Sequence, residues 1–213
     1  MTNYYKTHEE QEIYALSTID FTNKIVSILF LKGYEDYFKN TEKCFYHSQW
    51  ERVFIEEDRM ILHSSCVDTP YGGILFSGPS GIGKSTQSDL WINHEGAKLV
   101  NGDRPIIRKT ADVWYAYGSP YAGSSRCHIN EKTPVCAIVM LRQAKENSLR
   151  KLSLREAMMA VYQNLTIYTW DQVFVEKALD LTTSLIQDIP VYELGCLPEQ
   201  SAVEVLKQEL EEY

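Results

Sequence analysis

One eight-residue stretch, Gly78-Pro79-Ser80-Gly81-Ile82-Gly83-Lys84-Ser85, constrains the fold of this chain more than any other. It fits the pattern G-x-x-x-x-G-K-[S/T], in which a glycine-rich turn joins a buried strand to a helix. The apolar run 73–77 predicts the strand, and residues 86–92 predict the helix. We therefore expect an α/β fold in which residues 78–86 bind a phosphate group.

Each residue type in this stretch has a physical role. The glycines allow tight backbone turns that point successive N–H groups at one anion. Lys84 adds a mobile positive charge that can reach the outer phosphates, and the Ser85 hydroxyl can ligate Mg²⁺. Thr86 continues the binding segment into the helix, whose positive dipole end faces the same point. The motif indicates nucleotide phosphate and leaves the reaction open.

Composition narrows the class of protein. The 213 residues predict one domain, 1–213, and 44% hydrophobic residues suffice for a core. The formal net charge of −8 argues against nucleic-acid binding, which needs clustered Lys and Arg. Five scattered cysteines without a C-x-x-C pair predict reduced thiols. With no signal peptide or membrane-spanning run, we expect a cytoplasmic protein that has no membrane partner.

The hydrophobic pattern predicts how the elements are organised. Short runs of β-branched and aromatic residues predict a largely antiparallel region; they lie at 24–30, 44–46, 52–55 and 59–62. We therefore interpret 1–50 as a strand-rich N-terminal extension and 51–213 as the core. After the loop, strands are expected at 97–100, 105–107, 113–116 and 135–141, the last of them central.

The C-terminal third is predicted to be helical. Two S-x-x-E capping boxes, at 153–156 and 201–204, mark expected helix starts. Apolar stripes at helical spacing follow them, one over 174–185 and one over 203–210. We expect both stripes to pack on the sheet.

Two residues outside the loop are candidates for its chemistry. His63 lies fifteen residues before Gly78, and a turn at 68–72 would fold the intervening chain into a hairpin that returns His63 to the phosphate end. Asp103 follows the strand-like run 97–100, where a metal-binding carboxylate of the Walker-B type is expected. The simpler alternatives are a structural histidine and, for the segment Asn101-Gly102-Asp103, an ordinary turn.

The stretch 63–108 resembles the catalytic core of HPr kinase/phosphorylase. That family has a His before the loop, a loop ending Gly-x-Gly-Lys-Ser and a later Gly-x-x-Leu-Val-x-Asp-Asp segment, which here read His63, 81–85 and 96–103. The segments 117–125 and 189–194 resemble small stand-alone kinases of the same superfamily, some of which phosphorylate a peptide hydroxyl. The resemblance implies an α/β, phosphoenolpyruvate carboxykinase-like P-loop fold with a mixed central sheet, N-terminal antiparallel strands and C-terminal helices.

This chain departs from that family in two ways. The paired aspartates of the family are Gly102-Asp103 here, so one carboxylate is absent. The separate N-terminal domain of the full-length HPr enzymes is reduced or missing, which argues against HPr as the substrate. Those enzymes assemble as hexamers, and a homo-oligomer is an open possibility for this chain.

The resemblance and the motif together assign roles. Lys84 and the loop would hold the phosphates of ATP, ADP or pyrophosphate, and Ser85 with Asp103 would hold Mg²⁺. Asp103 would accept the proton of an acceptor hydroxyl or share the metal, and His63 would contact the transferring phosphoryl group or its acceptor. Arg104, Arg126 and His128 are candidates for acceptor binding, with Arg108 as a further one, although Arg126 and His128 would equally suit an ordinary surface loop.

The leading hypothesis is an ATP- and Mg²⁺-dependent kinase acting on a hydroxyl of a peptide, a protein or a small molecule. A second hypothesis is a nucleotide-binding regulator without catalysis, which the missing aspartate favours. A third, phosphoenolpyruvate carboxykinase activity, fits less well because the chain is short and shows no His/Lys metal set for oxaloacetate.

Overall fold

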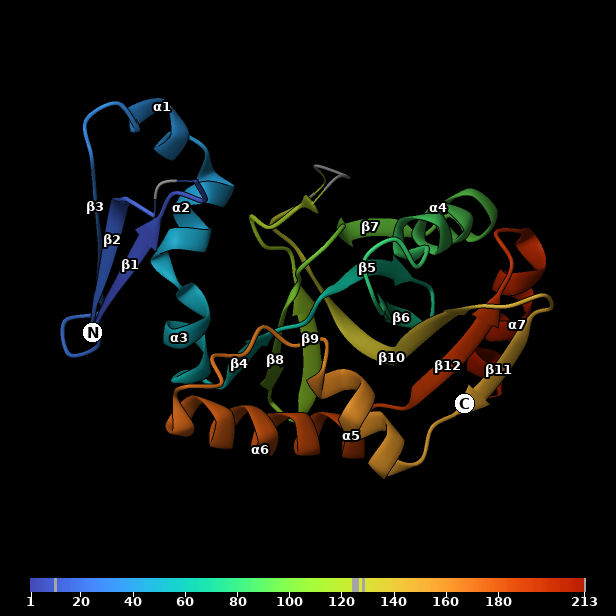
Figure 1. The fold of residues 1–213 in the computed structure, drawn as a ribbon. Coiled ribbons are helices and arrows are strands. Elements are labelled where there is room, and N and C mark those ends of the chain that lie inside the picture. The colour runs from blue at the N-terminus through green and yellow to red at the C-terminus, as the bar shows by residue number, and fades with distance from the viewer. Residues whose placement is uncertain (10, 124–126, 128, 213) are drawn as a thin grey trace. The chain divides into compact units, whose positions relative to one another are not determined.

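The computed structural model describes residues 1–9, 11–123, 127 and 129–212, and the described chain is mixed α/β. It divides into two compact units, 1–57 and 58–213 (Figure 1). Within the described residues, no helix has the length and apolar character needed to cross a membrane.

The first unit is a three-stranded antiparallel sheet with three short helices. The strands are β1 (Thr2–Lys6), β2 (Ile13–Asp20) and β3 (Ile25–Phe30), in that spatial order, and the helices are α1 (Glu35–Phe38), α2 (Thr41–Ser48) and α3 (Trp50–Ile55). The fully buried His47 lies among aromatic rings, with its Nε2 atom 2.8 Å from the Tyr14 hydroxyl. The strand predicted at 24–30 is confirmed as β3.

The strands predicted at 44–46 and 52–55 are wrong, because these segments lie in α2 and α3. Residues 44–46 are helical because α2 has an N-terminal cap: the Asn40 side chain accepts a hydrogen bond from the Lys43 N–H. Residues 52–55 are helical because aromatic rings pack along α3. The rings of Trp50 and Phe54, one helical turn apart, stack with centroids 5.9 Å apart. Tertiary packing thus overrides the strand preference of aromatic residues.

The second unit is built on a mixed nine-stranded sheet within the described residues. Seven strands follow the order β4-β8-β9-β10-β6-β5-β7, while β12 pairs with β10 and β11 pairs with β12. Strand β10 is central, as predicted, since it pairs in parallel with β6 and β12 and antiparallel with β9. The strands are β4 (Arg59–Ile61), β5 (Ser64–Thr69), β6 (Gly72–Ser77), β7 (Lys98–Asn101), β8 (Ile106–Thr110), β9 (Val113–Tyr117), β10 (Lys132–Gln143), β11 (Ser148–Lys151) and β12 (Val191–Cys196).

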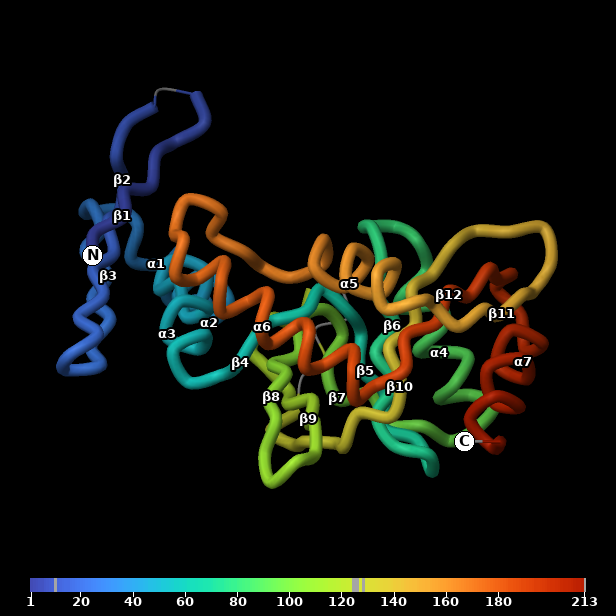
Figure 2. The backbone as a smooth tube through the Cα atoms, turned by 90° about the horizontal axis from the view of Figure 1, so that it is seen from below, coloured from blue at the N-terminus to red at the C-terminus, as the bar shows by residue number. Residues whose placement is uncertain are grey.

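Helices cover both faces of this sheet. The helices α5 (Leu154–Tyr162) and α6 (Gln172–Asp188) lie along one face, whereas α4 (Lys84–Glu95) and α7 (Gln200–Glu211) lie side by side on the other (Figures 1 and 2). Successive side chains of a strand point to opposite faces, so Leu75 joins the core under α5 and α6 while Ile74 and Phe76 join the core under α4. The sheet buries apolar residues on both sides, as a parallel strand layer requires.

The two predicted capping boxes have different outcomes. At α5 the Ser153 hydroxyl accepts from the Glu156 N–H and the Glu156 carboxylate accepts from the Ser153 N–H, so this box is confirmed. The prediction for Ser201 is wrong. Helix α7 begins at Gln200, so its N-cap is Glu199 and not Ser201, and the Glu199 side chain makes no capping hydrogen bond. The apolar stripes are confirmed, with Phe174 and Leu185 of α6 buried, as are Val203 and Leu206 of α7.

Trp91 anchors α4 to the sheet and therefore generates a stability prediction. Its side chain is fully buried, and its indole N–H has no hydrogen-bond partner in the described residues. We expect Trp91→Ala to lower the free energy of unfolding by about 3–5 kcal/mol, measured by urea denaturation.

Trp91→Phe is the matched variant. It keeps most of the ring and removes an unpaired buried donor, a group whose burial costs about 1–3 kcal/mol. We expect less than half of the loss seen for Trp91→Ala. Equal losses for the two variants would show that ring packing does not hold this helix.

Candidate functional site

A β-hairpin brings His63 to the start of the phosphate-loop motif. Strands β5 and β6 pair antiparallel with Ser64 opposite Ser77, so the residue before one strand lies beside the residue after the other. The Ser77 hydroxyl donates a 2.9 Å hydrogen bond to the carbonyl oxygen of His63. The predicted hairpin is confirmed, and it places His63 next to Gly78.

The loop backbone has the conformation that its glycines allow. Gly78, Gly81 and Gly83 have φ angles of 140°, 79° and 116°, a region that residues with a Cβ rarely adopt. Gly83 is the N-terminal cap of α4, so Lys84 is the first helical residue. The N–H groups of a first helical turn have no intrahelical acceptors. They therefore point into the same space as the loop.

Strand β5 fixes the first turn of α4. The Ser65 hydroxyl donates to the carbonyl oxygen of Lys84 at 3.3 Å, and the Ser88 hydroxyl donates to Ser65 Oγ at 2.7 Å. All three residues are buried. The hairpin that delivers His63 thus also holds the helix that carries Lys84.

The Lys84 side chain folds back onto its own loop. It is 9% exposed, and its Nζ atom donates to the carbonyl oxygens of Gly78 at 3.0 Å and Pro79 at 3.2 Å. Burial lowers the pKa of the Lys84 ammonium, and the Asp103 carboxylate opposes that shift. A partly desolvated cation is therefore held at the mouth of the loop.

Asp103 is positioned by the side chain of Asn101, the last residue of β7. The Asn101 Oδ1 atom accepts hydrogen bonds from the N–H groups of Asp103 at 3.0 Å and Arg104 at 2.7 Å. Asn101 is fully buried, and its Nδ2 atom donates to the carbonyl oxygen of Ser119 at 3.0 Å. The turn anticipated for the pair Asn101-Gly102 is present, and it serves to aim Asp103.

The side chains of His63 and Asp103 are paired in the site. Their Nε2 and Oδ1 atoms lie 3.3 Å apart, with side chains 23% and 24% exposed. The backbone holds both residues, since the His63 N–H donates to Asn164 O at 2.8 Å and the Ser64 N–H donates to Asp103 O at 2.9 Å. The positions of His63 and Asp103 are therefore fixed by backbone hydrogen bonds as well as by the contact between their side chains.

The neighbours of Asp103 keep it ionised. Burial by itself would raise the pKa of the carboxyl, but the hydrogen bond from His63 and the charges of Arg104, His63 and Lys84 outweigh it. The pKa of Asp103 therefore lies below its usual value. Its charge stabilises the fold at pH values above about 3.8, and this contribution is lost as the pH falls through the lower folded pKa.

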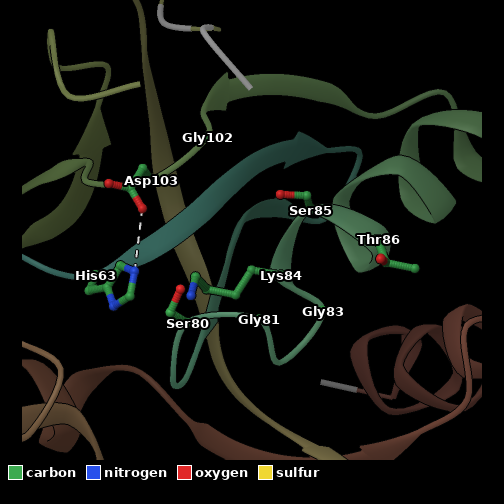
Figure 3. A pocket seen from close by; sticks show the side chains of 9 residues that line it. All are labelled: His63, Ser80, Gly81, Gly83, Lys84, Ser85, Thr86, Gly102 and Asp103. Atoms are coloured by element: carbon green, nitrogen blue, oxygen red, sulfur yellow. Dashed lines mark ion pairs between the residues drawn. The ribbon is translucent and has the colours of Figure 1, made fainter. Parts of the chain in front are cut away.

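These groups line one cavity of about 290 Å³. In Figure 3 the His63–Asp103 pair lies on one side, and Lys84 on the loop lies across from it. The cavity brings together the predicted catalytic residues and most of the predicted phosphate-binding residues, whereas Gly78, Pro79 and Ile82 do not line it. The lining residues are His63, Ser80, Gly81, Gly83, Lys84, Ser85, Thr86, Gly102 and Asp103.

The candidate acceptor-binding residues differ in their positions. Arg104 is not among the lining residues. Its Nε atom lies 3.3 Å from Asp103 Oδ2, and its Nη1 atom donates to Thr166 Oγ1 at 2.7 Å. Arg108 is on β8, where it pairs with Arg59 of β4. Arg126 and His128 lie outside the described residues.

Gly123 contacts Asp103, a role that the sequence pattern did not single out. Its φ angle is 57°, and a Cβ placed there would lie 2.8 Å from Asp103 Cβ and 3.0 Å from Asp103 Cγ. Both facts favour glycine. The loop after β9 therefore supports Asp103 at two points, through Ser119 and through Gly123.

The donor set fits Mg²⁺ only together with a phosphate ligand. In the described parts of the chain no group of three or more His, Cys, Asp or Glu side chains could hold a metal ion. Ser85 and Asp103 each present an oxygen to the same cavity. Mg²⁺ is commonly bound by one or two protein oxygens, with substrate phosphates and water completing the octahedron. The two residues match that mode.

Comparison with known proteins adds little to this description. No protein-family model matches the chain, and no curated protein matches it. Among solved structures, the Hpr(Ser) kinase/phosphatase from Coxiella burnetii is similar at 13% sequence identity and a TM-score of 0.43, covering 71% of this chain and 97% of that one. A likeness this weak carries no argument about activity, so the function must be argued from the site itself.

The contact between His63 and Asp103 predicts how the pKa of Asp103 changes when His63 is replaced. We expect His63→Ala to raise the pKa of Asp103, because the variant removes the hydrogen bond that lowers it and leaves the burial that raises it. Carboxyl-carbon NMR titration measures this pKa directly. His94→Ala, which changes an exposed histidine at the other end of α4, should leave it unchanged. An unaltered Asp103 pKa in His63→Ala would contradict the pairing.

Proposed function

We propose that this chain is a phosphotransferase of the HPr kinase-like, phosphoenolpyruvate carboxykinase-like P-loop type, which transfers a phosphoryl group from ATP to a hydroxyl of a peptide, a protein or a small molecule. One observation carries the proposal. A glycine-rich loop, a buried lysine, the first turn of a helix and a His–Asp pair share one cavity. Phosphoryl transfer needs this combination of anion binding, charge neutralisation and a base beside the acceptor.

The roles follow from the contacts. Lys84 and the backbone N–H groups of the loop would bind the outer phosphates, and releasing the Gly78 and Pro79 carbonyls would free the ammonium to do so. Ser85 and Asp103 would hold Mg²⁺. The ion, when bound, neutralises phosphate charge. These residues position the reactants and need not form a covalent bond themselves.

Asp103 is assigned as the acceptor of the hydroxyl proton. Its low pKa keeps it ionised at neutral pH, which suits a carboxylate that faces a metal and leaves it free to receive a proton, while the same shift makes it a weaker base. The bond between the acceptor oxygen and the γ-phosphorus forms while the bond to the leaving ADP oxygen breaks. His63 orients the Asp103 carboxylate and lies where it would contact the transferred group.

Two substitutions separate a kinase from a nucleotide-binding regulator without catalysis. We expect Lys84→Ala to lower transfer from Mg²⁺-ATP by at least about 100-fold, because a preorganised charge on the transferring group is lost. Asp103→Asn should abolish transfer while nucleotide binding persists. Lys98→Ala, which removes an exposed lysine paired with Glu131, should match the wild type. The assay measures ATP turnover across a panel of hydroxyl acceptors.

Full transfer by Lys84→Ala would exclude this mechanism. Tight nucleotide binding by the wild type without turnover on any acceptor would favour the regulator.

Gly123 gives a test of how Asp103 is positioned. Gly123→Ala adds both left-handed strain and a clash with Asp103, whereas Gly96→Ala adds strain alone because nothing lies within 4 Å of its added Cβ. Gly96→Ala should lower the free energy of unfolding by about 1 kcal/mol through strain, and Gly123→Ala should lower it by more because the clash adds to the strain. Only Gly123→Ala should lower kcat, by about ten-fold or more for a displacement of the order of 1 Å. Equal kcat values for the two variants would remove Gly123 from the site.

A further inference from the structure

A second cavity adjoins the phosphate loop. Its volume is about 370 Å³, and it shares Gly81, Gly83 and Thr86 with the first cavity. Ile82 of the loop and Gln87 of α4 also line it, and two distant segments complete the wall, one starting at Gln143 and the other at Cys196. The loop therefore has one cavity next to the His63–Asp103 pair and another next to the ends of β10 and β12.

The sheet topology explains why these segments meet at the loop. Strands β6, β10 and β12 run parallel, with Met140 of β10 opposite Ser77 of β6, and Gln143 of β10 opposite Cys196 of β12. The carboxyl ends of these three strands therefore lie side by side. In open α/β sheets, ligands bind next to the carboxyl ends of the strands.

The two cavities differ in chemistry. Lys84 and Asp103 put charge into the first, whereas the described residues that line the second include no Lys, Arg, His, Asp or Glu. The second is walled by Ile82, Ala144, Leu197 and Pro198, with the amides of Gln87 and Gln143 and the thiol of Cys196. An apolar wall with a few polar groups suits a flat, uncharged ring system and is a poor site for a phosphate.

Gln87 marks a polar position in this wall. It is 2% exposed and lines the cavity together with Cys196. Its Oε1 atom has no hydrogen-bond partner in the described residues. Buried amide oxygens are rarely left unpaired in folded proteins. Turning the Gln87 side chain toward the cavity would bring this buried oxygen within reach of a ligand donor such as an exocyclic amine or a ribose hydroxyl.

From these observations we infer that the second cavity binds the base and ribose of the phosphate donor, so that the donor is a nucleoside phosphate and not inorganic pyrophosphate. The inference rests on the proposed function. The phosphates cross the shared residues Gly81, Gly83 and Thr86 toward His63 and Asp103, and the uncharged nucleoside stays in the uncharged cavity. Gln87 and Gln143 are the side chains that read the polar edge of the base.

The wild-type protein provides the first test. Isothermal titration with Mg²⁺ compares ATP with inorganic tripolyphosphate, which carries the same phosphate chain without a nucleoside. We expect ATP to bind at least about ten-fold more tightly, since only ATP buries a ring system. Equal affinities would overturn the inference and leave phosphate binding at the loop intact. Failure of both ligands to bind would refute the proposed function and the inference with it.

A cavity-filling variant provides the second test. Ala144→Trp should weaken ATP by about ten-fold or more and change tripolyphosphate by less than about two-fold. Val113→Trp is the matched control, because it adds the same ring at an exposed position on β9 and should alter neither affinity. Parallel losses for ATP and tripolyphosphate in Ala144→Trp would contradict a nucleoside site.

A third test uses the wild-type protein, so its result does not depend on whether Ala144→Trp folds. Cys196 lines the second cavity, so ATP should slow its alkylation, and tripolyphosphate should not. Mass spectrometry resolves Cys196 from Cys44, a partly buried thiol of the first unit that lines neither cavity and serves as the internal reference. Protection of Cys196 by both ligands, or by neither, would contradict the inference.

Discussion

The antiparallel pairing of β5 with β6 is the constraint on which the site depends. Because Ser64 lies opposite Ser77, the chain enters and leaves the hairpin at one point, and His63 and Gly78 become neighbours. A one-residue shift in this register would move the side chains of one strand to the opposite faces of the sheet and disrupt the packing of both cores. The packing of the two cores on either side of the sheet therefore fixes this register, and with it the positions of His63 and Gly78.

Charge is concentrated in a small part of the molecule. Lys84, Asp103 and Arg104 lie close together, and the attraction of Asp103 to both cations offsets part of the cost of burying them, whereas Lys84 and Arg104 repel each other. The Asp103 carboxylate is the centre of this arrangement, since His63, Arg104 and Lys84 all lower its pKa. Such preorganised charge is costly in a fold without a ligand and useful where a polyanion must be bound. The uncharged cavity beside it completes a site with two chemically distinct halves.

The sequence predicts the parts of the site that depend on local patterns. The loop motif, the hairpin around residues 68–72 and the carboxylate after β7 follow from spacing and residue type, and the structure brings His63, Lys84 and Asp103 to one cavity. The central position of β10 follows from its long apolar run.

Other features could not be predicted because they depend on tertiary contacts. Aromatic residues in α2 and α3 have strand propensity, but an Asn40 cap and ring packing determine helix. Asn101 reads as a turn residue, and only its buried contacts with Ser119 and the Asp103 N–H show that it aims the carboxylate. The second cavity joins Gly81 to residues near 143 and 196, so no local pattern could indicate it.

The central claim is that a nucleoside triphosphate lies along the loop with its last phosphate facing the His63–Asp103 pair. A crystal structure of the protein with Mg²⁺ and a non-hydrolysable ATP analogue tests it most directly. The account predicts the γ-phosphate in the cavity lined by His63, Lys84 and Asp103, with the base against Gln87 and Leu197. A γ-phosphate directed away from Asp103, or a nucleotide bound elsewhere on the chain, would contradict it.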